Sequence, residues 1–405
     1  MDERTTVTEY LRLGVRFGRL APRLLHGYTG DGRLLSEVYS EPPPAPRELA
    51  AQARRLRGLV RSGDLPARRG EFLLGQLTAL DCLGRMLAGA RPSFGARLRA
   101  CFQLDAVVGE PEPYERAHAE LDTILPGTGP LSRRMAAFRE RDRVPPRVLP
   151  ACVRALSTAL RERTSEVLGL PGGESVDYRF VTDPRVSGLH HYLGHGRSRV
   201  SVGLAAPHRT ASLPRLIAHE SYPGHHVQYC RRRSPCRAPE QAVVLAQTPE
   251  CVVAEGLAER GLDTVVGPGW GEWARRVLSG VLRFPHAELA ERVDRALRKL
   301  SGVRGDAAVM LHEHGCSRER VCAYLRHWLL LDETRATALV DLLSDPTPAA
   351  HAVVCSEGER LMVSRTAQDE VVGTARDYLR LLEEPHVPRT VRAALVAPTG
   401  DHTVE

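Results

Sequence analysis

Apolar residues recur at intervals of three and four along most of the chain, a spacing that is typical of amphipathic helices. The spacing is clearest over residues 47–104 and continues over 113–123 and 130–162. It returns from residue 270 and persists toward the C-terminus. Residues 1–40 carry the same pattern in EYLRLGVRFGRLAPRLL, which we expect to form a helix that leads into a turn at TGDG. The pattern therefore predicts a mainly α fold.

The pattern changes after about residue 165, where short stretches with β-branched residues alternate with turn-forming residues. We expect two or three short strands near 175–204, as a small β insert in the helical chain. A helix is predicted to follow in SLPRLIAHESY, with Ser212 as its N-cap and Pro214 in its first turn. Residues 239–262 are predicted to form another helix.

The length of the chain suggests more than one structural region. It has 405 residues, which exceeds the usual size of one compact core. The change of pattern divides it into an N-terminal helical region, 1–164, and a second region, 165–405, which holds the short strands and further helices. Hydrophobic residues make up 42% of the chain, enough for a buried core. No run of about 18 apolar residues occurs, so we expect no membrane-spanning helix.

The N-terminus and the cysteines indicate a cytoplasmic protein. The stretch MDERTTVTEYLRLG is charged and lacks the apolar segment of a secretory signal. The nine cysteines are odd in number and form no C-x-x-C pair. We therefore expect reduced thiols, mostly as small core residues, as in proteins of the cytoplasm.

The net charge of +7 would be compatible with a polyanionic partner. However, the basic residues are nearly all arginines, with Lys299 as the only lysine, and they alternate with acids, as in ERDR at 140–143. This composition indicates a GC-rich genome and solvated helix faces, and we expect a bacterial protein. We predict no nucleic-acid binding.

The stretch HESYPGHHVQ, residues 219–228, contains the most concentrated chemistry of the chain. It begins like the zinc-protease motif H-E-x-x-H, in which two histidines one helical turn apart bind zinc. Here Pro223 occupies the place of the second histidine. In an unbroken helix His225 would lie about 120° away from His219, and His226 would lie about 10 Å further along the axis.

The residues between these histidines can break the helix. Pro223 lacks the N–H that would bond back to residue 219, and it displaces Tyr222 from the α conformation. Gly224 can adopt a positive φ. The Tyr-Pro-Gly stretch can therefore fold His225 or His226 back toward His219, and the residues alone leave open which of the two it is.

A third ligand for a metal is expected from TPECVVAEGLAERGLD, residues 248–263. Glu255 lies in the middle of this predicted helix, and Gly256 beside it permits another backbone to approach closely. Glu259 lies one turn further on, where it can orient a metal-binding histidine. We therefore predict a zinc site that includes His219 and Glu255.

These motifs resemble a known family. The combination of H-E-x-Y-P-G-H-H with an E-G-x-A-x-x-E helix is similar to the signature of domain-of-unknown-function family 885, and HESYPGHHVQ and AEGLAERG carry the resemblance. HYLGHGRSRVSV, residues 191–202, and CSEGERLM, residues 355–362, are similar to further stretches of the family. Members resemble helical gluzincin metallopeptidases of the oligopeptidase and carboxypeptidase Taq kind. The resemblance implies a helical body with a half-enclosed cleft.

The resemblance also implies roles for individual residues. Glycine often precedes the second ligand histidine in such enzymes, which favours His225 over His226. By this resemblance His219, His225 and Glu255 bind one zinc ion per chain, and Glu220 is the general base that activates a zinc-bound water. His226 would then contact substrate or support the metal ligands.

The chain departs from the family pattern at three positions. Leu257 replaces an expected tryptophan, and His351 and Cys355 stand where tyrosines are expected. A tyrosine hydroxyl commonly stabilises the oxyanion in such enzymes. Three residues near the strands are our candidates for this role: His190, His191 and Tyr192. Arg360 is our candidate for binding a substrate carboxylate.

The expected function is that of a cytoplasmic zinc-dependent hydrolase of a peptide or small amide bond. One alternative is a metal-dependent tailoring enzyme of small-molecule metabolism, such as a deacylase or a lyase. A further alternative is a non-catalytic protein that binds a metal and a partner.

Overall fold

The structure of the protein is a computed structural model that describes residues 2–183, 186–232, 237–363 and 374–396. It is mainly helical, with two small sheets, as the hydrophobic pattern predicts. Within the described residues no helix is long and apolar enough to cross a membrane.

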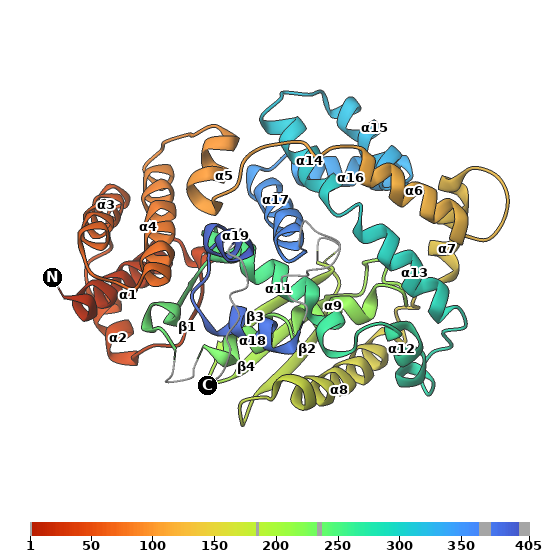
Figure 1. Ribbon diagram of the computed structural model, residues 1–405, viewed down its shortest axis with the longest axis horizontal. Coiled ribbons are helices and arrows are strands. Elements are labelled where there is room, and N and C mark those ends of the chain that lie inside the picture. The colour runs from red at the N-terminus through yellow and green to blue at the C-terminus, as the bar shows by residue number, and fades with distance from the viewer. Residues whose placement is uncertain (1, 184–185, 233–236, 364–373, 397–405) are drawn as a thin grey trace.

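The N-terminal helices gather at one end of the molecule (Figure 1), where α3 packs along both α1 and α4. Their buried faces carry large apolar side chains such as Tyr10, Phe17 and Phe72. The bounds of these elements are α1 (Glu3–Leu20), α2 (Gly32–Ser40), α3 (Pro46–Ser62), α4 (Ala67–Leu87) and α5 (Phe94–Phe102).

The first 40 residues differ from the prediction of a helix that leads directly into a turn. Helix α1 ends at Leu20, and the chain continues through the 3₁₀ turn η1 (Pro22–Leu24) into the strand β1 (Leu25–Tyr28). Pro22 cannot continue the helical hydrogen bonding, which explains the early end. Strand β1 pairs antiparallel with β5 (Val243–Leu245) in a two-stranded sheet that the sequence pattern does not indicate.

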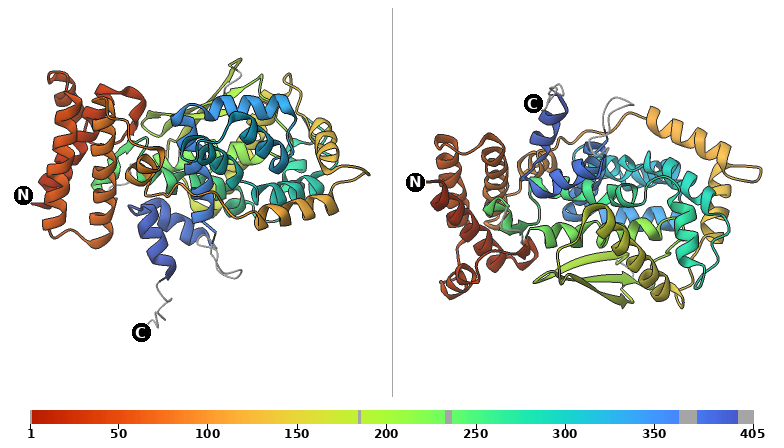
Figure 2. Two further views of the ribbon diagram at one scale, coloured as in Figure 1. Left: turned by 90° about the horizontal axis from the view of Figure 1, so that it is seen from above. Right: turned by 60° about the horizontal axis from the view of Figure 1, so that its bottom comes forward.

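Three further helices lead to the larger sheet: α6 (Glu112–Ile124), α7 (Leu131–Arg141) and α8 (Leu149–Leu168). The boundary proposed between residues 164 and 165 lies inside α8, which is one continuous helix. The view from below in Figure 2 shows α8 beside the sheet. The hydroxyl of Tyr178 in the sheet contacts the Ser157 hydroxyl of α8 at 2.9 Å.

The larger sheet consists of β2 (Ser175–Val181), β3 (Gly188–Gly194) and β4 (Arg197–Gly203). The prediction of short strands near 175–204 is therefore confirmed. The strand order is β2-β4-β3, with β2 and β4 parallel and β3 and β4 antiparallel. Strand β3 therefore lies at one edge of this sheet.

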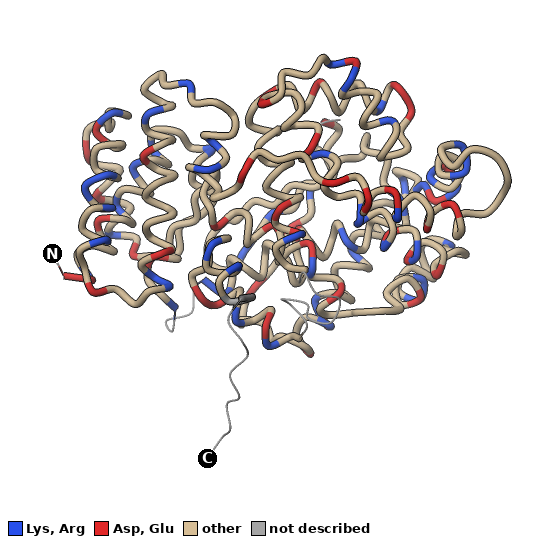
Figure 3. The backbone as a smooth tube through the Cα atoms, turned by 45° about the horizontal axis from the view of Figure 1, so that its top comes forward, with Lys and Arg blue, Asp and Glu red and all other residues tan. Residues whose placement is uncertain are grey.

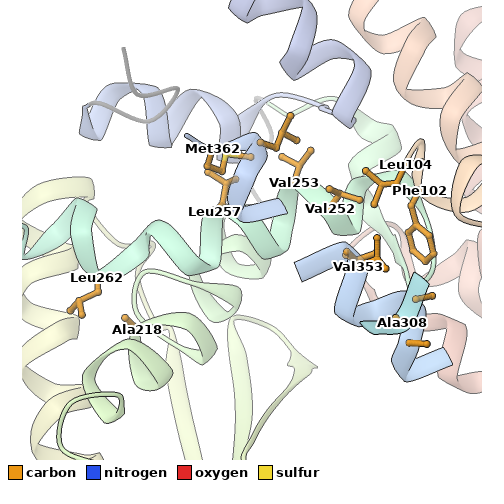
Figure 4. Packing of buried hydrophobic residues seen from close by; sticks show 14 of the residues in the cluster. Phe102, Leu104, Ala218, Val252, Val253, Leu257, Leu262, Ala308, Val353 and Met362 are labelled. Carbon is orange, nitrogen blue, oxygen red and sulfur yellow. The ribbon is translucent and has the colours of Figure 1, made fainter. Parts of the chain in front are cut away.

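Helix α11 (Pro249–Val265) runs through the middle of the molecule and packs against α9 (Leu213–Glu220) and α17 (Pro346–Leu361). The crossing with α17 is close because two glycines meet there. A Cβ atom on Gly256 would lie 2.2 Å from the carbonyl oxygen of Gly358, and one on Gly358 would lie 2.5 Å from a carbonyl of α11. Figure 4 shows the apolar residues around this crossing, with Leu257 of α11 beside Met362.

The remaining elements surround this centre. The 3₁₀ turn η2 (Pro239–Ala242) precedes β5. The helical pattern predicted from residue 270 is confirmed by six of the helices: α12 (Trp270–Leu278), α13 (Ala287–Arg298), α14 (Gly302–His312), α15 (Arg318–Trp328), α16 (Glu333–Leu343) and α17. They are followed by α18 (Ala375–Glu383) and α19 (Pro388–Val396). Basic and acidic residues are interspersed along the described backbone (Figure 3).

Candidate metal centre

The chain folds back between α9 and α10 (His225–Arg231), at the Tyr-Pro-Gly stretch. Helix α9 ends at Glu220, and the peptide bond between Tyr222 and Pro223 is cis. The role predicted for Gly224, a positive φ, is wrong, because its φ is −69°. The glycine is required for space instead, since a Cβ atom there would lie 1.9 Å from the carbonyl oxygen of His219.

This break brings His225, and not His226, to His219. The two rings of His219 and His225 lie edge to face with their centroids 4.7 Å apart. Glu255 of α11 contacts both, with its Oε2 atom 3.3 Å from Nε2 of His219 and its Oε1 atom 3.6 Å from Nε2 of His225. The three ligand atoms form a group within 4.8 Å of one another, close enough to share one metal ion.

The Nδ1 atom of each imidazole, on the side of the ring away from Glu255, also has a hydrogen-bond partner. Nδ1 of His219 lies 3.3 Å from a carboxylate oxygen of Glu259. Nδ1 of His225 donates to Oε1 of Gln228 at 3.2 Å, and the Gln228 amide is oriented by its own bond to the carbonyl of Ala254. Both histidines therefore present Nε2 toward Glu255. Two imidazoles so oriented, together with a carboxylate, fit a zinc ion.

The electrostatics of the group favour a cation. Burial would by itself lower the pKa of His219, but its hydrogen bonds with Glu255 and Glu259 raise it well above the usual value. Burial opposes ionisation of Glu259, yet the bond to His219 and the charge of Arg215 hold its pKa at about 2. The carboxylates are thus ionised and make the site electronegative.

Glu220 lies next to the group as the last residue of α9 and is only 8% exposed. The backbone N–H of His190 acts on this carboxylate and favours its ionised form. Burial raises its pKa, while the charges of His219 and His225 partly oppose this effect. A buried carboxylate with a raised pKa beside a metal site is suited to accept and release a proton.

His226 points away from the group and is fully buried. Its Nδ1 atom lies 2.8 Å from the hydroxyl of Ser198, and its Nε2 atom lies 3.0 Å from Glu174. Glu174 also accepts bonds from Arg161 and Tyr222. The residue predicted to contact substrate is thus placed in a buried polar network, because it lies one position beyond the histidine that the break presents.

The three candidates for oxyanion stabilisation lie on β3 in different settings. The Tyr192 hydroxyl accepts a bond from the backbone N–H of Gly196 at 3.0 Å, inside its own hairpin. His190 contacts the Ser198 hydroxyl at 2.8 Å, and burial lowers its pKa well below the usual value. His191 is exposed. Tyr192 is therefore engaged in structure, whereas the imidazole of His191 is accessible.

A cavity of about 850 Å³ opens beside the group and is lined by His219, Glu255 and Glu259. Most of its wall is apolar, and the apolar lining includes Val293, Leu297, Leu300, Leu339 and Leu343. Arg360 is not part of this lining. Instead it donates to Glu357 at 2.7 Å and to the hydroxyl of Tyr114 at 3.1 Å.

Residues that the motifs did not indicate also surround Glu255. Cys355 of α17 lies 3.6 Å from Oε2 of Glu255 and 3.5 Å from Nε2 of His351. These three residues form a second group of possible metal ligands. The available signal was the spacing of four between His351 and Cys355, which places both on one helix face. His26 of β1 also lies near enough for the charge of Glu255 to act on it, and no sequence signal indicates this.

The structure therefore defines a class of protein that is mainly α, with two small sheets and a candidate metal centre on its central helices. No protein-family model matches the chain, and no curated protein matches it. Two solved structures share the fold, both of proteins provisionally described as lipoproteins. The one from Colwellia psychrerythraea is 15% identical with a TM-score of 0.55, over 87% of this chain and 67% of the other. The one from Shewanella oneidensis, of unknown function, is 13% identical with a TM-score of 0.50, over 87% and 73%.

Proposed function

We propose that the protein is a zinc-dependent hydrolase of a peptide or small amide bond, and a divergent relative of family 885 with a gluzincin-like centre. The observation that carries the proposal is the group formed by His219, His225 and Glu255, whose ligand atoms lie within 4.8 Å of one another. Both histidines have their outer nitrogen bound to a fixed acceptor, which is the arrangement expected of metal-binding imidazoles.

The residues around this centre have separate roles in the proposed reaction. A bound zinc ion would polarise the scissile carbonyl and lower the pKa of a water molecule. Glu220 would accept the proton of the attacking water and pass it to the leaving amine. The backbone N–H of His190 favours the ionised form of Glu220, which accepts the proton in this transfer. Glu259 keeps His219 oriented.

The cavity suggests what kind of amide the enzyme binds. Its wall is mainly apolar, but Arg209 and Arg304 line it as well. Within the described residues neither guanidinium forms a hydrogen bond or an ion pair, and Nε of Arg209 is buried without a partner. Unpaired cations in an apolar cavity favour a ligand with an anionic group. The proposed substrate is therefore a small amide or peptide with an apolar body and a carboxylate or similar anion.

A tailoring reaction, such as deacylation in small-molecule metabolism, is the second candidate. The observation that favours it is the setting of Tyr192, which is buried within its own hairpin, where its hydroxyl accepts from the backbone N–H of Gly196, and which does not line the cavity. A site of this kind would suit a narrower range of substrates than a general peptidase. Efficient cleavage of a broad set of short peptides would exclude the second candidate.

We propose a cytoplasmic location, on the basis of the cysteines, which are odd in number and form no C-x-x-C pair. The competing location is the cell envelope, because the two similar structures are described as lipoproteins. Fractionation of the native host cells, with antibody detection of the full chain, distinguishes the two.

The test combines metal analysis with turnover. Protein purified without chelator should contain zinc bound by the His219 group, and His219→Ala should lose it, whereas His314→Ala, an exposed control, should not. Glu220→Gln should retain the zinc but lower kcat by about 10²–10⁴ on N-acylated amino acids or dipeptides. Full activity of Glu220→Gln would refute the proposed role of this residue. Folded protein that takes up no zinc would refute the proposed function.

A further inference from the structure

Glu255 takes part in two groups of possible metal ligands. On one side it meets His219 and His225, and on the other it meets His351 and Cys355. The five residues form two groups rather than one, so a single ion could not reach all their ligand atoms at normal bond lengths. Both Oε atoms of Glu255 are in use, since Oε1 faces His225 and Oε2 faces His219 and Cys355.

The distances in the second group fit a bound metal. Bonds of about 2.0–2.3 Å around a tetrahedral zinc ion place neighbouring ligand atoms roughly 3.3–3.7 Å apart. The Sγ atom of Cys355 lies 3.5 Å from Nε2 of His351 and 3.6 Å from Oε2 of Glu255. A histidine and a cysteine four residues apart on one helix can both reach a metal. All three residues line the cavity, so an ion could enter.

The helix crossing explains why these residues meet. Gly256 follows Glu255 directly, and Gly358 lies one turn after Cys355. The two glycines let α11 and α17 approach until a Cβ atom on either would collide with the other backbone. The approach therefore carries the cysteine and histidine of α17 to the carboxylate of α11. This mechanism is independent of the break between α9 and α10, which builds the first group.

We propose that His351, Cys355 and Glu255 form a second metal position, selective for zinc or a similar thiophilic divalent ion, with Glu255 bridging the two positions. The inference rests on the proposed zinc centre only in that it shares Glu255. A mixture of thiolate, imidazole and carboxylate ligands favours zinc over magnesium or calcium. Two-metal sites with a bridging carboxylate are common in hydrolases, and a second cation would supply the charge stabilisation that the expected tyrosines would otherwise give.

Cobalt is the probe for this position, because its bond to thiolate gives an intense near-ultraviolet charge-transfer band. Metal-free full-length protein is titrated with Co²⁺ and followed by absorbance and by metal content. The native protein should bind two ions per chain and develop the thiolate band. Cys355→Ser and His351→Ala should each bind one ion, and Cys355→Ser should lack the band. Cys251→Ser, on the same helix as Glu255, should behave like the native protein.

The outcomes separate this inference from the proposed function. His225→Ala should lose one ion but keep the thiolate band, because the second group does not contain His225. One ion per native chain that produces no thiolate band would overturn the second position. If that ion produces no thiolate band and is lost in His219→Ala, the proposed zinc centre still stands. No bound ion would overturn both. The circular dichroism of each variant, compared with the native spectrum, shows that the chain has folded.

Discussion

The two neighbouring histidines, His225 and His226, should behave in opposite ways when each is replaced by leucine. The variant His226→Leu should unfold more easily but still bind zinc. The variant His225→Leu should lose the zinc ion bound by the His219 group but keep nearly all of the stability of the metal-free protein. The two side chains are adjacent in sequence. A difference between the two variants therefore tests whether the break before α10 places His225 in the metal centre and His226 in the buried network.

The magnitude follows from the bonds that each change removes. His226 is fully buried, and its ring contacts Glu174 at 3.0 Å and Ser198 at 2.8 Å. A hydrogen bond to a charged group contributes about 1.5–3 kcal/mol, and one to a neutral group about 1 kcal/mol. The free energy of unfolding should therefore fall by about 2.5–4 kcal/mol in His226→Leu. His225→Leu removes the hydrogen bond to Gln228, which corresponds to about 1 kcal/mol, and a longer contact with Glu255 at 3.6 Å.

The assay is urea denaturation of the metal-free proteins, followed by zinc titration of the folded ones. Leucine approximates the volume of the imidazole ring, so the change leaves no large cavity that would add to the loss. Equal losses of stability in the two variants would refute the reasoning. So would a His226→Leu protein that remains folded but no longer binds zinc, because His226 would then act in the metal centre.

Further predictions concern the surroundings of the centre. Glu259→Gln should weaken zinc binding by about 10–100-fold in competition with a chelator, and unchanged affinity would show that Glu259 does not orient His219. Gly256→Ala should lower the free energy of unfolding by about 1–3 kcal/mol in urea, because the added methyl group collides with the facing backbone. Burial opposes ionisation of Glu174, yet its hydrogen bonds hold its pKa at about 2, below the usual 4.5. As the pH falls, the unfolded chain therefore takes up the proton of Glu174 before the folded chain does. The stability that Glu174 contributes is present above pH 4.5, and the free energy of unfolding should fall by about 3 kcal/mol toward pH 2. The variant Glu174→Gln should lack this decline. Arg209→Met should raise KM for anionic amides and leave KM for neutral amides unchanged, and equal effects on both would exclude an anion site.

Much of the fold was predictable because most helices here carry a clear apolar period. The strands near 175–204 were also predictable, since they form locally from a hairpin and one neighbouring strand. The pair β1 and β5 was not, because each strand is short and its partner lies more than two hundred residues away. Pairing at such a distance depends on the packing of the whole chain and leaves no local pattern.

The candidate site was predictable only in part. The motif indicated His219, Glu220 and Glu255, since their spacing has direct chemical meaning. The choice between His225 and His226 depends on the backbone at Gly224, whose missing Cβ atom matters more than its φ. The arginines that line the cavity, Arg209 and Arg304, could not be predicted from the sequence, because they come from separate elements that meet only in the folded chain.

The two metal-ligand groups are built by different structural causes, and this explains why the sequence motif indicated only one. The first depends on a backbone break within a few residues and on Glu255 of the next long helix, so two short motifs encode it. The second depends on the crossing of α11 and α17, which joins positions about one hundred residues apart. Glu255 belongs to both, because it lies on α11, which touches α9 as well as α17. A widened crossing would therefore separate Cys355 from Glu255 while His219 and His225 stayed together, so the chain could gain or lose the second position without losing the first.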